Sequence, residues 1–241
     1  MTVWGKILGG AAGMVLGGPF GALAGAVAGH AVDRFRAAQE PADATRSVAF
    51  TIAVIVLGAK MAKADGVVTP PEVRAFREVF HVPPEEEKNV ARLFDRARRD
   101  AQGFEPYARQ VGRLLQDSPA VLEELLDCLF HIAKADGEVG AAELDYLRRV
   151  AELFGIGEEG FARIRAAHLG PDRSDPYVIL GLPHDASNEE IKQRWRALTR
   201  EHHPDRLIAQ GMPAEFVEIA DRTMAAINAA YDAIAKTRGM V

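Results

Sequence analysis

Residues 187–206 read SNEEIKQRWRALTREHHPDR, and this stretch decides the fold of the C-terminal part of the chain. Ser187 followed three residues later by Glu190 is the pattern of a capping box, which predicts that a helix begins here. The apolar residues of the stretch recur at the spacing of one helical face, so we expect them to point into a core. They are Ile191, Trp195 and Leu198.

The tripeptide His203-Pro204-Asp205 is expected to end this helix. Pro204 has no amide proton, and it disfavours helical geometry at the residue before it. The chain therefore has to turn there, and the turn presents an imidazole and a carboxylate on a loop. Such an exposed and stiffened pair can dock to a partner without a substrate pocket.

Two further helices flank this stretch. Residues 175–182 predict a short helix that Gly181 closes. A later helix is expected from about Pro213 and should pack antiparallel to the helix that begins after Ser187. This helix carries Phe216, Ile219, Ala220, Thr223, Ile227 and Tyr231.

This arrangement resembles the J domain of Hsp40-type co-chaperones. The features that it shares with them are the Leu-Gly ending of the short first helix, the His-Pro-Asp turn and the terminal Asn228-Ala229-Ala230-Tyr231. Trp195 is a departure, because many J domains have tyrosine there. The resemblance implies a helical hairpin that stimulates ATP hydrolysis by an Hsp70 chaperone such as DnaK. It implies that the residues facing this partner are Lys192, Arg196, His203, Pro204, Asp205 and Arg206.

The middle of the chain contains an internal repeat. Residues 62–67 read AKADGV and residues 133–138 read AKADGE, and a glutamate, Glu72 or Glu143, follows each aspartate after seven positions. In both copies an apolar helix is expected to end at Asp-Gly and another to begin shortly afterwards. Two copies are too few for a solenoid, so we expect a domain of paired helical hairpins.

The acidic residues of the repeat leave two interpretations open. Asp65, Glu72, Asp136 and Glu143 could supply oxygen ligands to a divalent cation. Alternatively, they shape helix ends: Thr69 and Glu72 form a capping box, and the glycines after the aspartates suit helix exits at positive φ. The alternating acids of an EF-hand are missing, which favours the structural role.

The duplicated motif resembles the TerB-like all-helical domain of tellurite-resistance and membrane-associated stress proteins, over residues 47–168. In that family the acidic positions have been linked to divalent cations. The second copy has Gly140 where the first has the capping threonine, so the two copies can differ in their roles.

Residues 7–28 contain no charged side chain and are numerous enough for a helix to cross a bilayer. Glycines recur there at a spacing of four, which suits close helix packing in membranes. A cleaved signal peptide and a soluble glycine-rich tail are the alternatives to a transmembrane segment over residues 1–31. The recurring glycines are Gly9, Gly13, Gly17, Gly21 and Gly25.

Composition excludes several classes of function. The formal net charge of −5 gives no sign of a nucleic-acid binder, and the single cysteine, Cys128, lies in an apolar run and is expected to be a buried thiol. No nucleophile, phosphate loop or metal triad accompanies His203 and Asp205, so we expect no enzyme. We expect no cofactor either, apart from the divalent cation considered above.

Together these features predict an all-α chain: a transmembrane segment, a polar linker over residues 32–46, the TerB-like domain, and a J domain over residues 169–241. The combination resembles the DjlA-like family of membrane-anchored DnaJ-type co-chaperones. It implies a single-pass protein of the bacterial inner membrane with its bulk in the cytoplasm, bound to the lipid bilayer and an Hsp70, and able to form a homodimer through its membrane helix. The alternative is a membrane-associated stress or cation-sensing module in which the TerB-like domain is the active part.

Overall fold

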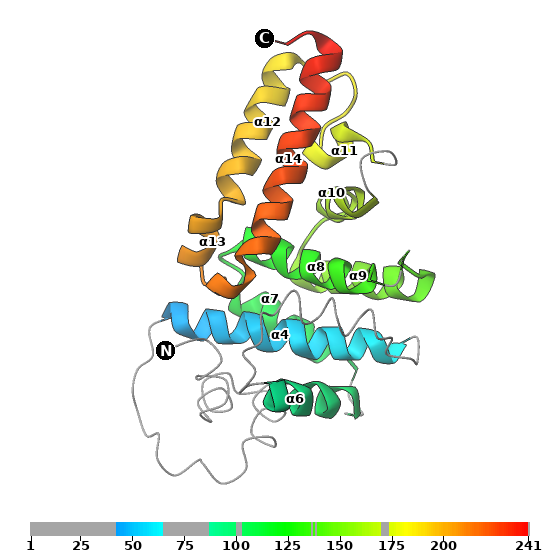
Figure 1. Cartoon of the computed structure of the whole chain (residues 1–241), viewed down its shortest axis with the longest axis vertical. Coiled ribbons are helices and arrows are strands. Elements are labelled where there is room, and N and C mark those ends of the chain that lie inside the picture. Colours follow the sequence, from blue (N-terminus) through cyan, green and yellow to red (C-terminus); the bar gives the residue numbers. More distant parts are fainter. Residues whose placement is uncertain are drawn as a thin grey trace.

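The computed structural model describes residues 42–64, 87–99, 103–135, 137, 139–169 and 174–240, and all regular elements within these ranges are helices (Figure 1). This confirms the predicted all-α class. The helices are α4 (Ala42–Ala64), α6 (Glu87–Arg99), α7 (Glu105–Leu114), α8 (Pro119–Ala133), α9 (Ala141–Phe154), α10 (Glu158–Leu169), α11 (Pro176–Leu180), α12 (Asn188–Glu201), α13 (Pro204–Ala209), the 3-10 turn η2 (Ala214–Phe216) and α14 (Val217–Arg238).

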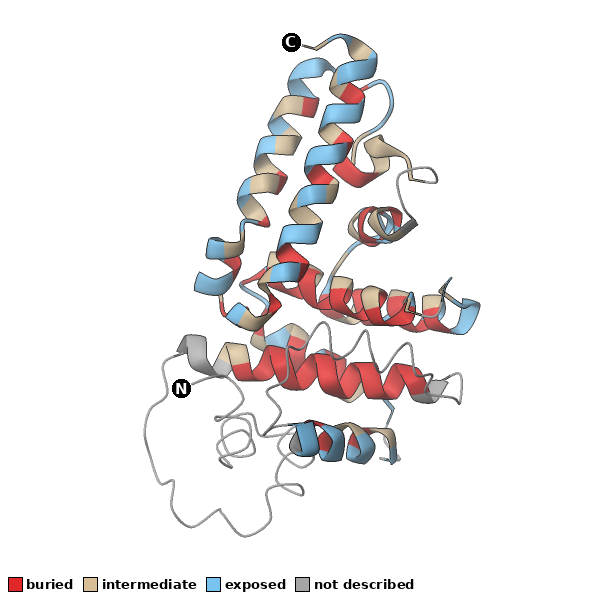
Figure 2. Ribbon diagram, in the orientation of Figure 1, coloured by how far each residue is buried: buried red, intermediate tan, exposed pale blue. Residues whose placement is uncertain are grey.

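Helix α4 is the central element of the middle domain. Its residues 48–62 are buried on every side, as Figure 2 shows. A helix that is apolar all round has to be enclosed, and α4 packs against α6, α7, α8 and α9. Lys60 is a charged residue within this buried stretch. Its ammonium group lies 4.9 Å from the centre of the Tyr107 ring, so the charge has an aromatic partner.

Helices α8 and α9 form the hairpin that contains the second copy of the repeat. Gly137 between them has the predicted positive φ, +138°, but it is not the helix exit. Helix α8 ends four residues earlier, at Ala133, and its C-cap Lys134 has a right-handed helical φ of −81°. Cys128 of α8 is buried, as expected. The hydroxyl of Tyr146 in α9 donates to the carbonyl oxygen of Leu57 at 2.8 Å, which fixes the hairpin to α4.

Helices α12 and α14 form the long hairpin of the C-terminal domain, with α11 packed against α14 (Figure 1). The capping box is present: Ser187 N–H donates to Glu190 Oε2 at 2.7 Å, and Glu190 N–H donates to Ser187 Oγ at 3.3 Å. Trp195 stacks on Tyr231 with ring centres 4.4 Å apart. Its indole N–H donates to Asn228 Oδ1 at 2.9 Å, and this intramolecular acceptor was not expected from the sequence.

The C-terminal domain has two cores. Its outer part has a core of its own, which includes Ile191, Leu198 and Ile227 and extends to Ala166 of α10. Its inner part, the segment from α13 to the start of α14, is buried in the core of the middle domain. The base of the hairpin therefore shares the hydrophobic core of the middle domain.

Within the described residues, no helix is long and apolar enough to cross a membrane. The glycines predicted to pack a membrane helix, Gly9, Gly13, Gly17, Gly21 and Gly25, lie outside the described residues.

Candidate partner-docking site

The His203-Pro204-Asp205 turn joins α12 to α13. The structure ends α12 at Glu201, and His203 adopts extended geometry with a φ of −63° and a ψ of 128°. The sequence predicted a loop, whereas the structure begins a new helix at Pro204. The reason is that the first turn of a helix tolerates proline, whose missing amide proton has no intrahelical partner there. Asp205 consequently lies in the first turn of α13.

The side chains of the turn are exposed. That of Asp205 is 91% exposed and that of His203 is 54% exposed. The backbone N–H of Asp205 donates to His203 Nδ1 at 3.2 Å, so this imidazole caps α13 and is held above its first turn. Nδ1 is occupied as an acceptor in this contact, which leaves Nε2 to face a partner as a donor.

The predicted basic residues lie on α12 and at the start of α13. Arg196 and Arg206 are exposed, and Lys192 is half-buried. Pro204, the remaining predicted residue, is also half-buried. The site thus consists of cationic side chains on one helix and a carboxylate at the beginning of the next, a surface that suits an acidic partner with an arginine of its own.

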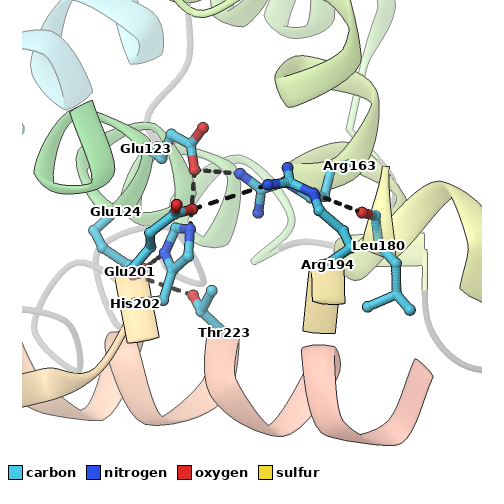
Figure 3. Close-up of polar contacts among 8 residues, drawn as sticks. All are labelled: Glu123, Glu124, Arg163, Leu180, Arg194, Glu201, His202 and Thr223. Carbon is cyan, nitrogen blue, oxygen red and sulfur yellow. Dashed lines mark hydrogen bonds and ion pairs between the residues drawn. The ribbon is translucent and has the colours of Figure 1, made fainter. Parts of the chain in front are cut away.

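His202, the neighbour of His203, points the opposite way. Its side chain is 2% exposed and lies between the two domains (Figure 3). His202 Nδ1 is 2.8 Å from Glu124 Oε1, and Nε2 is 3.1 Å from Glu123 Oε2. Arg163 of α10 donates to the same oxygen of Glu123, and Thr223 Oγ1 of α14 donates to Glu124 Oε2 at 3.1 Å.

These contacts decide the charges of the cluster. Burial by itself lowers the pKa of His202, but hydrogen bonds to Glu123 and Glu124 outweigh it and raise this pKa from 6.5 to about 9. Burial also acts to raise the pKa of Glu123, yet the hydrogen bond from His202 and the charge of Arg163 lower it to about 2. Burial raises the pKa of Glu124. His202 is therefore a cation at neutral pH, and Glu123 is the anion that it faces.

This cluster was not predicted from the sequence. Glu123 and Glu124 interrupt an otherwise apolar helix. Because a buried carboxylate needs a hydrogen-bond or charge partner, the sequence does indicate that these glutamates have one. Nothing in the sequence says that the partner is His202, which lies 78 residues from Glu124.

Ile208 was also missed. Among the described residues it is the large hydrophobic side chain that is exposed, at 37%. It lies on α13 three residues after Asp205, and residues at this spacing are neighbours on a helix surface.

Of the predicted cation ligands, the structure describes Glu143 only. Its Oε2 accepts from the backbone N–H of Gly140 at 2.8 Å, which is a helix-capping contact. Asp65, Glu72 and Asp136 lie outside the described residues. Among the residues that the structure does describe, no three acidic, histidine or cysteine side chains gather as a metal site would require.

Three family models match the chain, one for each predicted part. Residues 1–47 match the family described as the transmembrane domain of the co-chaperone DjlA. Residues 51–166 match the tellurite resistance protein TerB, and residues 175–238 match the DnaJ domain. The first match indicates a membrane-anchored protein.

Curated relatives align over most of the chain. A co-chaperone protein DjlA from Shewanella oneidensis is 32% identical, over 81% of this chain and 80% of the relative. DjlA proteins from Coxiella burnetii and Photobacterium profundum are each 29% identical, and both alignments cover 98% of this chain. Among solved structures, none matches the chain.

Proposed function

The chain belongs to the DjlA family of co-chaperones, and from this we propose that it stimulates ATP hydrolysis by an Hsp70 chaperone of the DnaK type through the His203-Pro204-Asp205 turn. The family and the DnaJ domain indicate a co-chaperone role with an Hsp70-type partner. Beyond this role, we propose that the reaction is stimulated ATP hydrolysis and that the residues of the turn cause it. Catalysis belongs to the partner, so the chain itself is not an enzyme and requires no cofactor.

The observation that carries the proposal is the exposure of a rigid turn beside a basic helix. The His203 ring is fixed by the Asp205 N–H, and the Asp205 carboxylate is 91% exposed. A side chain that is held before binding, as the His203 ring is, loses little conformational entropy when it docks. The carboxylate can accept a charge-assisted hydrogen bond from an arginine of the partner.

The basic residues of α12 give the approach its direction. Lys192 and Arg196 are four positions apart and therefore share one side of the helix. Cationic side chains on one side attract an acidic surface and raise the rate of association. Arg206 extends this charge past the turn.

We propose that the protein spans the bacterial inner membrane once and holds its bulk in the cytoplasm. The motivation is that an Hsp70 needs ATP, which the cytoplasm supplies. Arg34 and Arg36 follow the apolar stretch and support this orientation. Protection of the C-terminus in sealed spheroplasts is the expected result, and cleavage by external protease would contradict it.

The glycine series supports a second proposal, a homodimer in the bilayer. Replacement of Gly13 and Gly17 by leucine should weaken crosslinking between copies, because larger side chains keep the helices apart. Unchanged crosslinking would contradict the dimer.

The test of the proposed function is Asp205→Asn in the full chain, measured by the affinity of ATP-bound DnaK and by its stimulated hydrolysis. We expect both to fall about tenfold or more, since a neutral amide forms a weaker bond to a cation. His184→Gln is the matched control, because His184 also pairs with an aspartate on the surface, at 2.6 Å from Asp175. Equal activity of the two variants would overturn the proposal.

A further inference from the structure

The exposed turn lies between two buried residues that contact the same neighbouring domain. His202 before it is 2% exposed, and Leu207 after it is 0% exposed. Between them, residues 203–206 are exposed or half-buried. We call residues 202–207 the arch, with His202 as its first foot and Leu207 as its second foot. Both feet are buried against the TerB-like domain.

The first foot is held by charge. His202 donates from both ring nitrogens, and each nitrogen has its own carboxylate on α8, Glu124 for Nδ1 and Glu123 for Nε2. Arg163 donates to the same oxygen of Glu123 that His202 contacts, and Thr223 donates to the second oxygen of Glu124 (Figure 3). A buried charge of this kind is costly to leave without its partner, and this fixes where the imidazole can lie.

The second foot is held by packing. Leu207, Met212 and Phe216 belong to the core that surrounds α4. The Phe216 ring meets the Phe50 ring edge-on, with centres 4.8 Å apart. Ser47 Oγ donates to the carbonyl oxygen of Gly211 at 2.9 Å, which adds a polar contact to the same junction.

We propose that His202 is a positioning residue, through which Glu123 and Glu124 of the TerB-like domain hold the His203-Pro204-Asp205 arch in the form that its chaperone partner recognises. The inference rests on the proposed function and deepens it. It makes the TerB-like domain a part of the docking machinery, although no residue of that domain needs to touch the partner.

The consequence is a specific kinetic pattern. When the first foot is released, the arch occupies its competent form for a smaller fraction of the time. The apparent affinity for the partner falls by that fraction, whereas a partner that has bound still meets an intact His203 and Asp205. The concentration of co-chaperone at half-maximal stimulation should rise, and the maximal stimulated rate should stay.

The experiment measures DnaK ATP hydrolysis against the concentration of the full chain, reconstituted in lipid nanodiscs. Glu124→Gln and His202→Gln change the His202–Glu124 contact from either side, and their double variant completes a mutant cycle. The matched control is His168→Gln. His168 forms a hydrogen bond of 2.7 Å with Asp127, a residue of the same helix α8 that carries Glu124. Unlike the His202–Glu124 contact, this one lies within the TerB-like domain. Hydrogen exchange at the amides of His203, Asp205 and Arg206 is measured alongside.

We expect each single variant to raise the half-maximal concentration about tenfold with the maximal rate unchanged, and the double variant to be no worse than either single variant. Exchange at the amides of His203, Asp205 and Arg206 should become faster, while exchange in α4 stays as in the wild type. Glu124→Gln is nearly isosteric and keeps an acceptor for Thr223, so it remains informative if His202→Gln folds poorly.

Two different failures can be told apart. If the His203→Gln variant abolishes stimulation but Glu124→Gln and His202→Gln behave like His168→Gln, the positioning role is overturned and the proposed function stands. If the wild-type chain does not stimulate DnaK, or His203→Gln stimulates as well as the wild type, the proposed function itself fails.

Discussion

His202 Nδ1 lies 2.8 Å from Glu124 Oε1, and this contact joins two domains across 78 residues of sequence. It places a buried cation directly before the exposed His203. Two adjacent histidines thus have separate tasks: one is enclosed by carboxylates, and the other caps a helix at the surface.

Stability of the domain junction should depend on pH. The pKa of His202 is raised from 6.5 to about 9, so its stabilising contribution is complete below pH 6.5 and is lost as the pH rises through about 9. Burial raises the pKa of Glu124, which also makes the junction less stable as the pH rises. Glu123, with its pKa lowered from 4.5 to about 2, contributes above pH 4.5 and loses its contribution towards pH 2.

The measurement is the difference in urea midpoint between the wild type and His202→Gln. This difference should be largest between about pH 5 and pH 6.5 and should shrink steadily up to about pH 9.5. A difference that stays constant over this range would show that His202 does not titrate as the junction requires.

Replacement of Phe216 by alanine should destabilise the middle domain, although Phe216 belongs to the C-terminal part of the sequence. The ring is 0% exposed and packs on Phe50, so its loss leaves a cavity and should cost about 3–5 kcal/mol of unfolding free energy. Ile208→Ala, on the exposed side of the same segment, should change little. Hydrogen exchange in α4 reports the effect, and protection of α4 equal to the wild type would contradict a shared core.

Gly211 should not accept a side chain. Its φ is +106°, and an added Cβ would lie 2.4 Å from Arg46 Cβ. Gly155 also has a positive φ, +77°, but nothing lies within 4 Å of its added Cβ. Both alanine variants should lose roughly 1–2 kcal/mol of unfolding free energy, because alanine disfavours a positive φ. Gly211→Ala should lose about 1–3 kcal/mol more, because its Cβ clashes with Arg46. Equal melting temperatures of the two variants would disprove the close approach at the junction.

Arg196→Ala should slow association with the chaperone partner by a few-fold at low ionic strength, about as much as one exposed steering charge contributes. The loss should shrink in higher salt, where the exposed charge is screened. Lys236→Ala is the control, since Lys236 is also exposed but lies in the last turn of α14. Stopped-flow association rates that fall equally for both variants would show that overall charge, rather than the α12 surface, directs the encounter.

The sequence predicts what depends on local chemistry. The capping box at Ser187 and the stop before Pro204 follow from backbone rules that act over a few residues, and the structure has both. The positive φ of Gly137 is confirmed as well, but α8 ends four residues before it, at Ala133. The resemblance to J and TerB-like domains supplied the architecture, and the family models confirm both domains.

The junction could not be predicted in this way. Glu124 and His202 meet because two domains pack together, and a single sequence does not record which distant residues share a surface. The core that Phe216 joins was not predicted, since a helical pattern shows that a face is apolar and leaves open what covers it. The helix at Pro204 was missed because proline stops a helix and also begins one.

The most direct test of the account is the rate at which DnaK hydrolyses a single round of bound ATP in the presence of saturating co-chaperone. We expect the wild-type chain to accelerate this step and the His203→Gln variant to leave it at the basal rate, with the helical circular dichroism of the two proteins equal. Acceleration by His203→Gln to the wild-type rate would contradict the central claim that the exposed histidine of the arch is what the chaperone recognises.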